Sequence, residues 1–178
     1  MPHKNMSNVK GQWSNVNPGF TRIELAVVVG IYILLFVFVV IARQTTRAES
    51  RDVQRLSDAR QLSSIIENQY IDTPNEMLFG CSSLYALVNT CTGPGKISQL
   101  KDLKDPSAGS SNPCKGISSG FASQGVCGYS ISNMEGNGSA STDSYQICFF
   151  IERGGKIQGF SKGLYRIETG GILKQGCN

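Results

Sequence analysis

The chain has 178 residues, enough for one globular domain and an additional segment. Its formal net charge is +4, of which Lys4 and Lys10 supply +2. Residues 20–178 therefore carry about +2, which gives no electrostatic reason to expect nucleic-acid binding. The single histidine, His3, lies near the N-terminus, which excludes Ser-His-Asp and Cys-His catalysis and most Cys/His zinc sites from the rest of the chain.

An uncharged run at residues 25–42 is long enough to cross a membrane as a helix. Of its 18 residues, 14 are Leu, Ile, Val or Phe. Such a helix measures about 27 Å, close to the thickness of the hydrocarbon core of a bilayer. A secretory signal has a shorter apolar region and a small-residue cleavage site, whereas Arg43 and Arg47 follow this run. We therefore expect a membrane-spanning helix, whose orientation the charges on its two sides leave open.

The residues directly before the apolar run form a processing motif. They read Gly19-Phe20-Thr21-Arg22-Ile23-Glu24. This pattern closely resembles the type IV prepilin motif, in which a short basic leader ends in Gly. In that family Phe begins the mature chain and Glu is its fifth residue.

The resemblance implies a role for each of these positions. Residues 1–19 would be a leader peptide on the cytoplasmic side, cut by a prepilin peptidase between Gly19 and Phe20, and the new amino group of Phe20 would be methylated. Residues 20–44 would be the transmembrane and assembly half of a long helix. Glu24 would neutralise the N-terminus of a neighbouring subunit and so set the stagger of helices in a filament. Physical chemistry agrees, because Gly19 lets a peptidase approach the backbone and an ionised Glu24 needs a partner in apolar surroundings.

Two positions depart from the usual pattern of the family. Arg22 stands where an apolar residue is typical, and its charge makes burial of this end of the helix less favourable. Ile41 stands where many pilins have Pro, a residue that loosens a helix. We therefore expect a continuous helix through residues 30–41.

Residues 45–73 are expected to be the amphipathic half of the same helix, which would run over 23–70 and end before Pro74. Apolar residues recur at every third or fourth position, which is typical of a helix that packs on one side. The apolar positions are Val53, Leu56, Ala59, Leu62, Ile66 and Tyr70. Charged residues are expected to be solvated on the other face: Arg47, Glu49, Arg51, Asp52, Arg55, Asp58 and Arg60.

Residues 74–178 are expected to form a globular head with variable loops and an antiparallel β-sheet, which makes the fold class α+β. The first part, to residue 128, is rich in Gly, Ser, Asn and Pro, with short helical turns near 82–88 and 97–103. The resemblance implies the type IV pilin fold, in which such a sheet packs against the amphipathic half of the long helix.

The strands are predicted in the C-terminal third. Alternating apolar residues predict a strand over 145–152, followed by a Gly154-Gly155 turn. A partner strand is expected over 156–161 and a third over 164–168, before the Gly170-Gly171 turn. Residues 129–132 are a further strand candidate.

All six cysteines follow the apolar run, and no two have C-x-x-C spacing. This arrangement predicts disulfides in an oxidising compartment, with the head outside the cytoplasm. Six cysteines permit many pairings, so connectivity stays open. A sequential scheme is the working expectation because each bond then closes a local loop: Cys81–Cys91, Cys114–Cys127 and Cys148–Cys177.

The functional expectation is a structural pilin of a type IV pilus that serves adhesion, motility or DNA uptake, without enzyme activity, cofactor or metal. The partners implied are further copies of the chain, other pilins, the prepilin peptidase, an inner-membrane assembly platform and, before assembly, membrane lipid. The chain would lie in the inner membrane first and in an extracellular filament afterwards.

Two alternatives stay open. A pseudopilin of a type II secretion system has the same leader and helix, but six cysteines and no clear acidic calcium loop favour the pilus. A single-span anchored extracellular domain of another function is the third, although no catalytic constellation stands out. The Ser/Gly/Asn-rich loops at 107–123 and 133–144 could be adhesive surface, glycan acceptor sites or plain connections.

Overall fold

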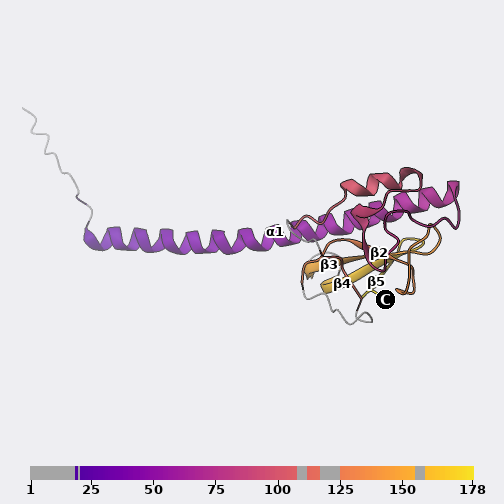
Figure 1. Ribbon diagram of the computed structural model, residues 1–178. Helices are drawn as coiled ribbons and strands as arrows, with labels where there is room; N and C mark the ends of the chain where they lie inside the picture. Colours follow the sequence, from indigo (N-terminus) through magenta and orange to yellow (C-terminus); the bar gives the residue numbers. More distant parts are fainter. Residues whose placement is uncertain (1–18, 20, 108–111, 117–124, 155–158) are drawn as a thin grey trace, which may run out of the picture. The chain divides into compact units, whose positions relative to one another are not determined.

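The computed structural model (Figure 1) describes residues 19, 21–107, 112–116, 125–154 and 159–178, with only the backbone at 44, 45, 96 and 98. By contacts the chain divides into two units, Met1–Ile41 and Ala42–Asn178, which are described separately. The elements are α1 (Arg22–Asp72), β1 (Ala86–Leu87), η1 (Val88–Thr90), η2 (Gly95–Asp102), β2 (Ser130–Ser132), β3 (Gln146–Gly154), β4 (Ser161–Glu168) and β5 (Ile172–Gln175).

Helix α1 is a single element of 51 residues, as the sequence predicts. It begins after Thr21, whose carbonyl accepts a hydrogen bond from the backbone N–H of Leu25 at 3.1 Å. It ends at Asp72, two residues before Pro74, which cannot continue a helix. The helix continues through residues 30–41 without a break, in line with the expectation for a chain that lacks Pro at Ile41.

The five strands form one antiparallel sheet in the order β1-β2-β3-β4-β5. The central pair is β3 and β4, where Ile147 lies opposite Ile167 and Phe149 opposite Tyr165. In Figure 1 the sheet lies beside the C-terminal part of α1. The α+β architecture, with its N-terminal helix and C-terminal antiparallel sheet, therefore agrees with the sequence prediction.

The core of the second unit lies between α1 and one face of this sheet. Each large aliphatic side chain that is fully buried here contributes about 1.5–3 kcal/mol. The helix and the strands supply most of the buried apolar residues: Leu56, Ala59, Leu62 and Ile66 from α1, and Ile131, Ile147, Phe149, Ile151 and Ile167 from the sheet.

The other face of β3 is also covered, because alternate residues of a strand point to opposite sides. Cys148 and Phe150 pack there in a second cluster with Tyr85 and the remaining cysteines of two disulfides. The three disulfides join the cysteines in the sequential scheme that the sequence analysis adopts: Cys81–Cys91, Cys114–Cys127 and Cys148–Cys177.

The predicted helix face needs correction at both ends of the amphipathic half. Val53 and Tyr70 are 52% and 44% exposed, so neither belongs to the core. The buried stripe of α1 instead includes Asp52, Arg55 and Gln69. Each consecutive residue is rotated by about 100° around a helix, so Val53 and Tyr70 turn away from the stripe that their neighbours join.

The strand predictions were correct in part. β3 and β2 lie where strands were expected at 145–152 and 129–132. The separate partner strand over 156–161 is wrong at residues 159 and 160, because β4 begins only at Ser161. β4 is one strand that includes the stretch assigned to a third strand. Residues 155–158 lie outside the described part.

Two short strands and one helical turn were not placed correctly by the sequence. β5 follows the Gly170-Gly171 turn, where both glycines have positive φ. β1 occupies part of the stretch expected as a helical turn at 82–88, and η1 follows it. The turn expected at 97–103 corresponds to η2.

Candidate functional site

The predicted processing site lies at the start of the described chain. Gly19 is exposed, and a Cβ added to it would have no neighbour within 4 Å. Phe20 lies outside the described residues, so its cleavage and methylation stay predictions from the sequence. Gly19 thus meets one requirement of a peptidase site, which is an unobstructed backbone.

The start of α1 is capped by Thr21, a residue whose role the sequence analysis missed. Its Oγ1 accepts a hydrogen bond from the backbone N–H of Glu24 at 3.3 Å. This is half of a capping box, and the Thr-x-x-Glu spacing before an apolar run was the signal that could have identified it. The cap fixes α1 to begin at Arg22 and so places Glu24 in the first turn.

Glu24 is exposed on the first turn of α1. A carboxylate in this position is favoured by the partial positive charge of the helix N-terminus. Among the described residues, its side chain has no ion-pair partner. Glu24 is therefore free to pair with a group from another molecule.

The first half of α1 is an uncovered apolar surface. Every described side chain from residue 21 to residue 43 is exposed. In the described residues, α1 is the one helix long and apolar enough to cross a membrane by length and composition. Its large exposed apolar residues include Ile23, Leu25, Val28, Ile31, Leu35, Phe36, Phe38 and Ile41. Water is a poor solvent for a continuous surface of this kind, so it requires lipid or other apolar helices.

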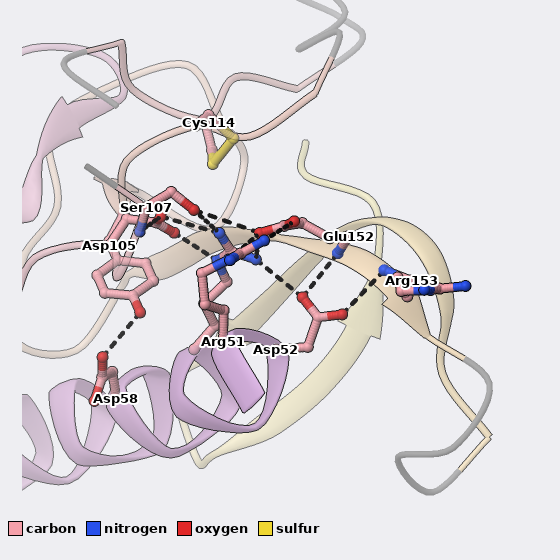
Figure 2. Close-up of polar contacts among 11 residues, drawn as sticks. Arg51, Asp52, Asp58, Asp105, Ser107, Cys114, Glu152 and Arg153 are labelled. Carbon is pink, nitrogen blue, oxygen red and sulfur yellow. Dashed lines mark hydrogen bonds and ion pairs between the residues drawn. A yellow bond between two sulfur atoms is a disulfide. The ribbon is translucent and has the colours of Figure 1, made fainter. Parts of the chain in front are cut away.

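The second half of α1 carries a buried charged cluster (Figure 2), here called the Arg55 cluster and made of Arg51, Asp52, Arg55, Asp105, Ser107 and Glu152. The Arg55 side chain is fully buried. Its Nε and Nη2 donate to the two carboxylate oxygens of Asp105 at 2.6 and 3.0 Å, and its Nη1 donates to Asp52 at 2.9 Å. The cluster therefore joins α1 to the loop after η2.

Glu152 and Asp52 extend the Arg55 cluster to the end of β3. Arg51 donates two hydrogen bonds to the Glu152 carboxylate, at 2.9 and 2.6 Å. Asp52 in turn accepts the backbone N–H groups of Glu152 and Arg153, at 2.8 and 3.0 Å, as Figure 2 shows. Side chain and backbone of one strand end are thus both bound to one turn of α1.

The charges of the Arg55 cluster hold one another in their ionised forms. The hydrogen bonds from Arg51 lower the pKa of Glu152 from 4.5 to about 2, against the opposing effect of burial, and Arg55 adds to this. Burial by itself lowers the pKa of Arg55, but the hydrogen bonds and charges of Asp105 and Glu152 outweigh it and raise that pKa. Near neutral pH Arg55 therefore stays protonated and Glu152 stays ionised, so the two act as a structural connection.

No family model, curated protein or solved structure matches this chain. The functional conclusion must therefore come from its own residues and their geometry.

A hollow of about 200 Å³ between α1 and β4 is lined by Arg60, Ser63, Ser64 and Glu67 with Ile167 and Gly171. Ligand pockets are usually larger, about 300–1,000 Å³. Within the described residues, no group of three or more His, Cys, Asp or Glu is placed to hold a metal ion.

The sequence predicted Asp52 and Arg55 on a solvated face, and this was wrong, because both side chains are buried. Their partners Asp105 and Glu152 are about 50 and 100 residues away in the chain. One local signal existed, since Asp52 and Arg55 have the i, i+3 spacing at which side chains on a helix meet. That spacing shows a pair but not its burial.

Proposed function

We propose that this chain is a type IV pilin, cut after a leader peptide and polymerised through the first half of α1. The main observation in support is the uncovered apolar segment of α1, which is preceded by Gly19-Phe20 and by a free carboxylate at Glu24. In this proposal the segment lies in lipid first and then packs against the same segment of neighbouring subunits.

Glu24 gives the assembly its register. An ionised carboxylate in an apolar bundle is costly unless an opposite charge neutralises it. The new amino group of Phe20 on a neighbouring subunit would provide that charge. Only one axial offset between helices would bring the two groups together.

The head would be the exposed part of the fibre, on the outer side of the membrane, and would have no enzyme activity. Its three disulfides support this placement because such bonds persist in oxidising compartments. The α+β architecture, with a sheet packed on the second half of the helix, is the arrangement that the resemblance to pilins implies. The surface loops of the head would then be available for adhesion.

Processing is the first test of this function. The protein purified from cells that have prepilin peptidase is expected to begin at Phe20 and to carry one added methyl group, by intact mass and N-terminal sequencing. Gly19→Leu should leave the leader attached. Gly30→Ala is the matched control, because a Cβ at Gly30 also meets nothing within 4 Å. A wild-type protein that begins at Met1, or downstream of Phe20, would contradict the proposal.

Assembly is the second test. Glu24→Gln should be processed normally but absent from sheared surface fibres, as judged by electron microscopy and immunoblotting. Asp72→Asn changes an exposed acid at the other end of α1 and should assemble like wild type. If the processed wild-type protein never occurs in a polymer, it is an anchored extracellular domain instead.

A pseudopilin of a type II secretion system is the competing function with the same leader and helix. The disulfides favour the pilus, since a fibre in the medium depends on a head that stays folded there. Deletion of the chain separates the two: a pilin is needed for surface fibres, a pseudopilin for protein secretion.

A further inference from the structure

The loop between β2 and β3 presents one asparagine in an unusual environment. Asn137 is exposed, and Glu135 lies two residues before it. The Nδ2 group of Asn137 donates a hydrogen bond to Oε2 of Glu135 at 2.9 Å. Ser139 lies two residues after it, so the sequence Asn137-Gly138-Ser139 has the Asn-x-Ser pattern of an N-glycan acceptor.

The rest of the loop holds the Asn137 side chain in place. Asn133 donates from Nδ2 to Oδ1 of Asn137 at 2.7 Å and accepts the backbone N–H groups of Asn137 and Gly138 at 3.0 and 3.1 Å. Gly136 has a φ of +69°, and a Cβ there would collide with the backbone of Asn178. The loop thus closes around Asn133, with the Asn137 nitrogen on its exposed side beside a carboxylate.

We propose that Asn137 is an N-glycosylation site, with an oligosaccharide on a polyprenyl pyrophosphate as donor and a membrane oligosaccharyltransferase as the enzyme. Nδ2 of Asn137 attacks the anomeric carbon of the first sugar, and the bond from that carbon to the pyrophosphate oxygen breaks. The electron pair of that bond leaves with the polyprenyl pyrophosphate. Nδ2 loses one proton to a base of the transferase and keeps the other, giving an N-glycosidic amide.

Glu135 is a positioning residue in this reaction. An amide nitrogen is a weak nucleophile because its lone pair is shared with the carbonyl group. A carboxylate that accepts one of its hydrogens orients the nitrogen and increases its electron density. The Ser139 hydroxyl donates to the carbonyl of Ser82 and must exchange this bond for one to the transferase.

A second Asn-x-Ser triplet in the chain provides an internal contrast. Asn5-Met6-Ser7 lies in the proposed leader, with His3 and no acid two residues before the asparagine. The leader stays in the cytoplasm in the proposed function, whereas such donors are used on the opposite, outer side of the membrane. Only Asn137 is therefore expected to carry a glycan, a conclusion that rests on export of the head.

The experiment uses the full chain in bacteria that contain an oligosaccharyltransferase, its lipid-linked oligosaccharide and a second protein known to accept it. Tandem mass spectrometry of the purified protein is expected to find the glycan on the peptide with Asn137. Asn137→Gln and Ser139→Ala should abolish it, while Ser139→Thr should keep it. Asn68→Gln, at an exposed helix position outside any such triplet, should have no effect.

The role of Glu135 is tested by two further variants. Glu135→Gln should lower the glycosylated fraction at early times about tenfold, as expected for loss of one charge-assisted hydrogen bond in the reacting state. Glu135→Asp keeps a carboxylate and should restore most of the early glycosylated fraction. Equal losses of the glycosylated fraction in both variants would indicate a merely structural role for Glu135 and would overturn its assignment as a positioning residue.

Three readouts on the same sample separate this proposal from the proposed function. An unmodified Asn137 in cells where the second protein is glycosylated overturns the glycan site, even if the chain begins at Phe20. A glycan on Asn137 of a chain that still begins at Met1 supports the site and contradicts processing. Cysteines that react with an alkylating reagent would show a head left in the cytoplasm, which overturns both.

Discussion

Arg55, in the second half of α1, is a fully buried cation with three carboxylates around it. Its contacts with Asp52, Asp105 and Glu152 leave no part of the guanidinium without an acceptor. Burying a charge in this way is tolerable only while all partners are present. Removing Arg55 therefore leaves uncompensated carboxylates inside the second unit.

Arg55→Met is expected to reduce the free energy of unfolding of the head by about 3–5 kcal/mol, because it leaves buried acids unpaired. The measurement is urea unfolding of the full chain in detergent, followed by tyrosine fluorescence. Arg60→Met, at an exposed position on the same helix, should change stability by about 0.5 kcal/mol or less. Equal effects of the two substitutions would contradict the assigned role of Arg55.

Asn133 is expected to protect the Asn137-Gly138 peptide from deamidation. Ring closure requires the backbone nitrogen of Gly138 to attack Cγ of Asn137, and Asn133 Oδ1 accepts the N–H of that nitrogen at 3.1 Å. In protein from cells without an oligosaccharyltransferase, Asn133→Ala should therefore speed the appearance of isoaspartate at Asn137 during incubation above neutral pH, by peptide mapping. Asn68→Ala, at an exposed position on α1, is the control and should leave the rate unchanged.

At the scale of elements, α1 could be predicted from the sequence almost to its ends. Its apolar run, the spacing of Leu56, Leu62 and Ile66, and Pro74 are all local signals. The Arg55 cluster could not be predicted, because its acids come from segments about 50 and 100 residues further along the chain. β1 and β5 were missed because strands of two and four residues are too short to show alternation.

The connection between α1 and β3 should weaken in acid. Glu152 has a folded-state pKa of about 2, below its ordinary 4.5, so its contribution is present above about pH 4.5. It is lost as the pH falls from there to about 2, because protonation then removes the partner of Arg51 and Arg55. Unfolding free energies of wild type and Glu152→Gln should therefore differ at pH 6 and converge towards about pH 2. A constant difference over this range would contradict the prediction.

The disulfide Cys148–Cys177 ties β3 to the end of the described chain, 29 residues later. Replacing both cysteines by Ala should reduce the free energy of unfolding by about 3–4 kcal/mol, from the added freedom of the unfolded chain. The same replacement of Cys81 and Cys91, which close a shorter loop of separation 10, should cost less. Denaturant unfolding of both variants under oxidising conditions provides the comparison.

At the scale of the whole molecule, the two units need different solvents. The first unit exposes apolar side chains throughout its described helix, whereas the second covers both faces of β3. A chain that begins at Ala42 is expected to be monomeric without detergent, by light scattering, and to retain three disulfides. The full chain should require detergent or lipid, and full solubility without either would contradict the assignment of its first half.

The paired contacts at the end of β3 have a mechanical consequence. A force along α1 is transmitted to the end of β3 by two sets of contacts. These are the two backbone hydrogen bonds to Asp52 and the bidentate pair between Arg51 and Glu152. These bonds originate from adjacent residues of one helical turn, so we expect them to share a load and to break together. Separation of the sheet from α1 by force should therefore require these hydrogen bonds to break at the same time, not one after another.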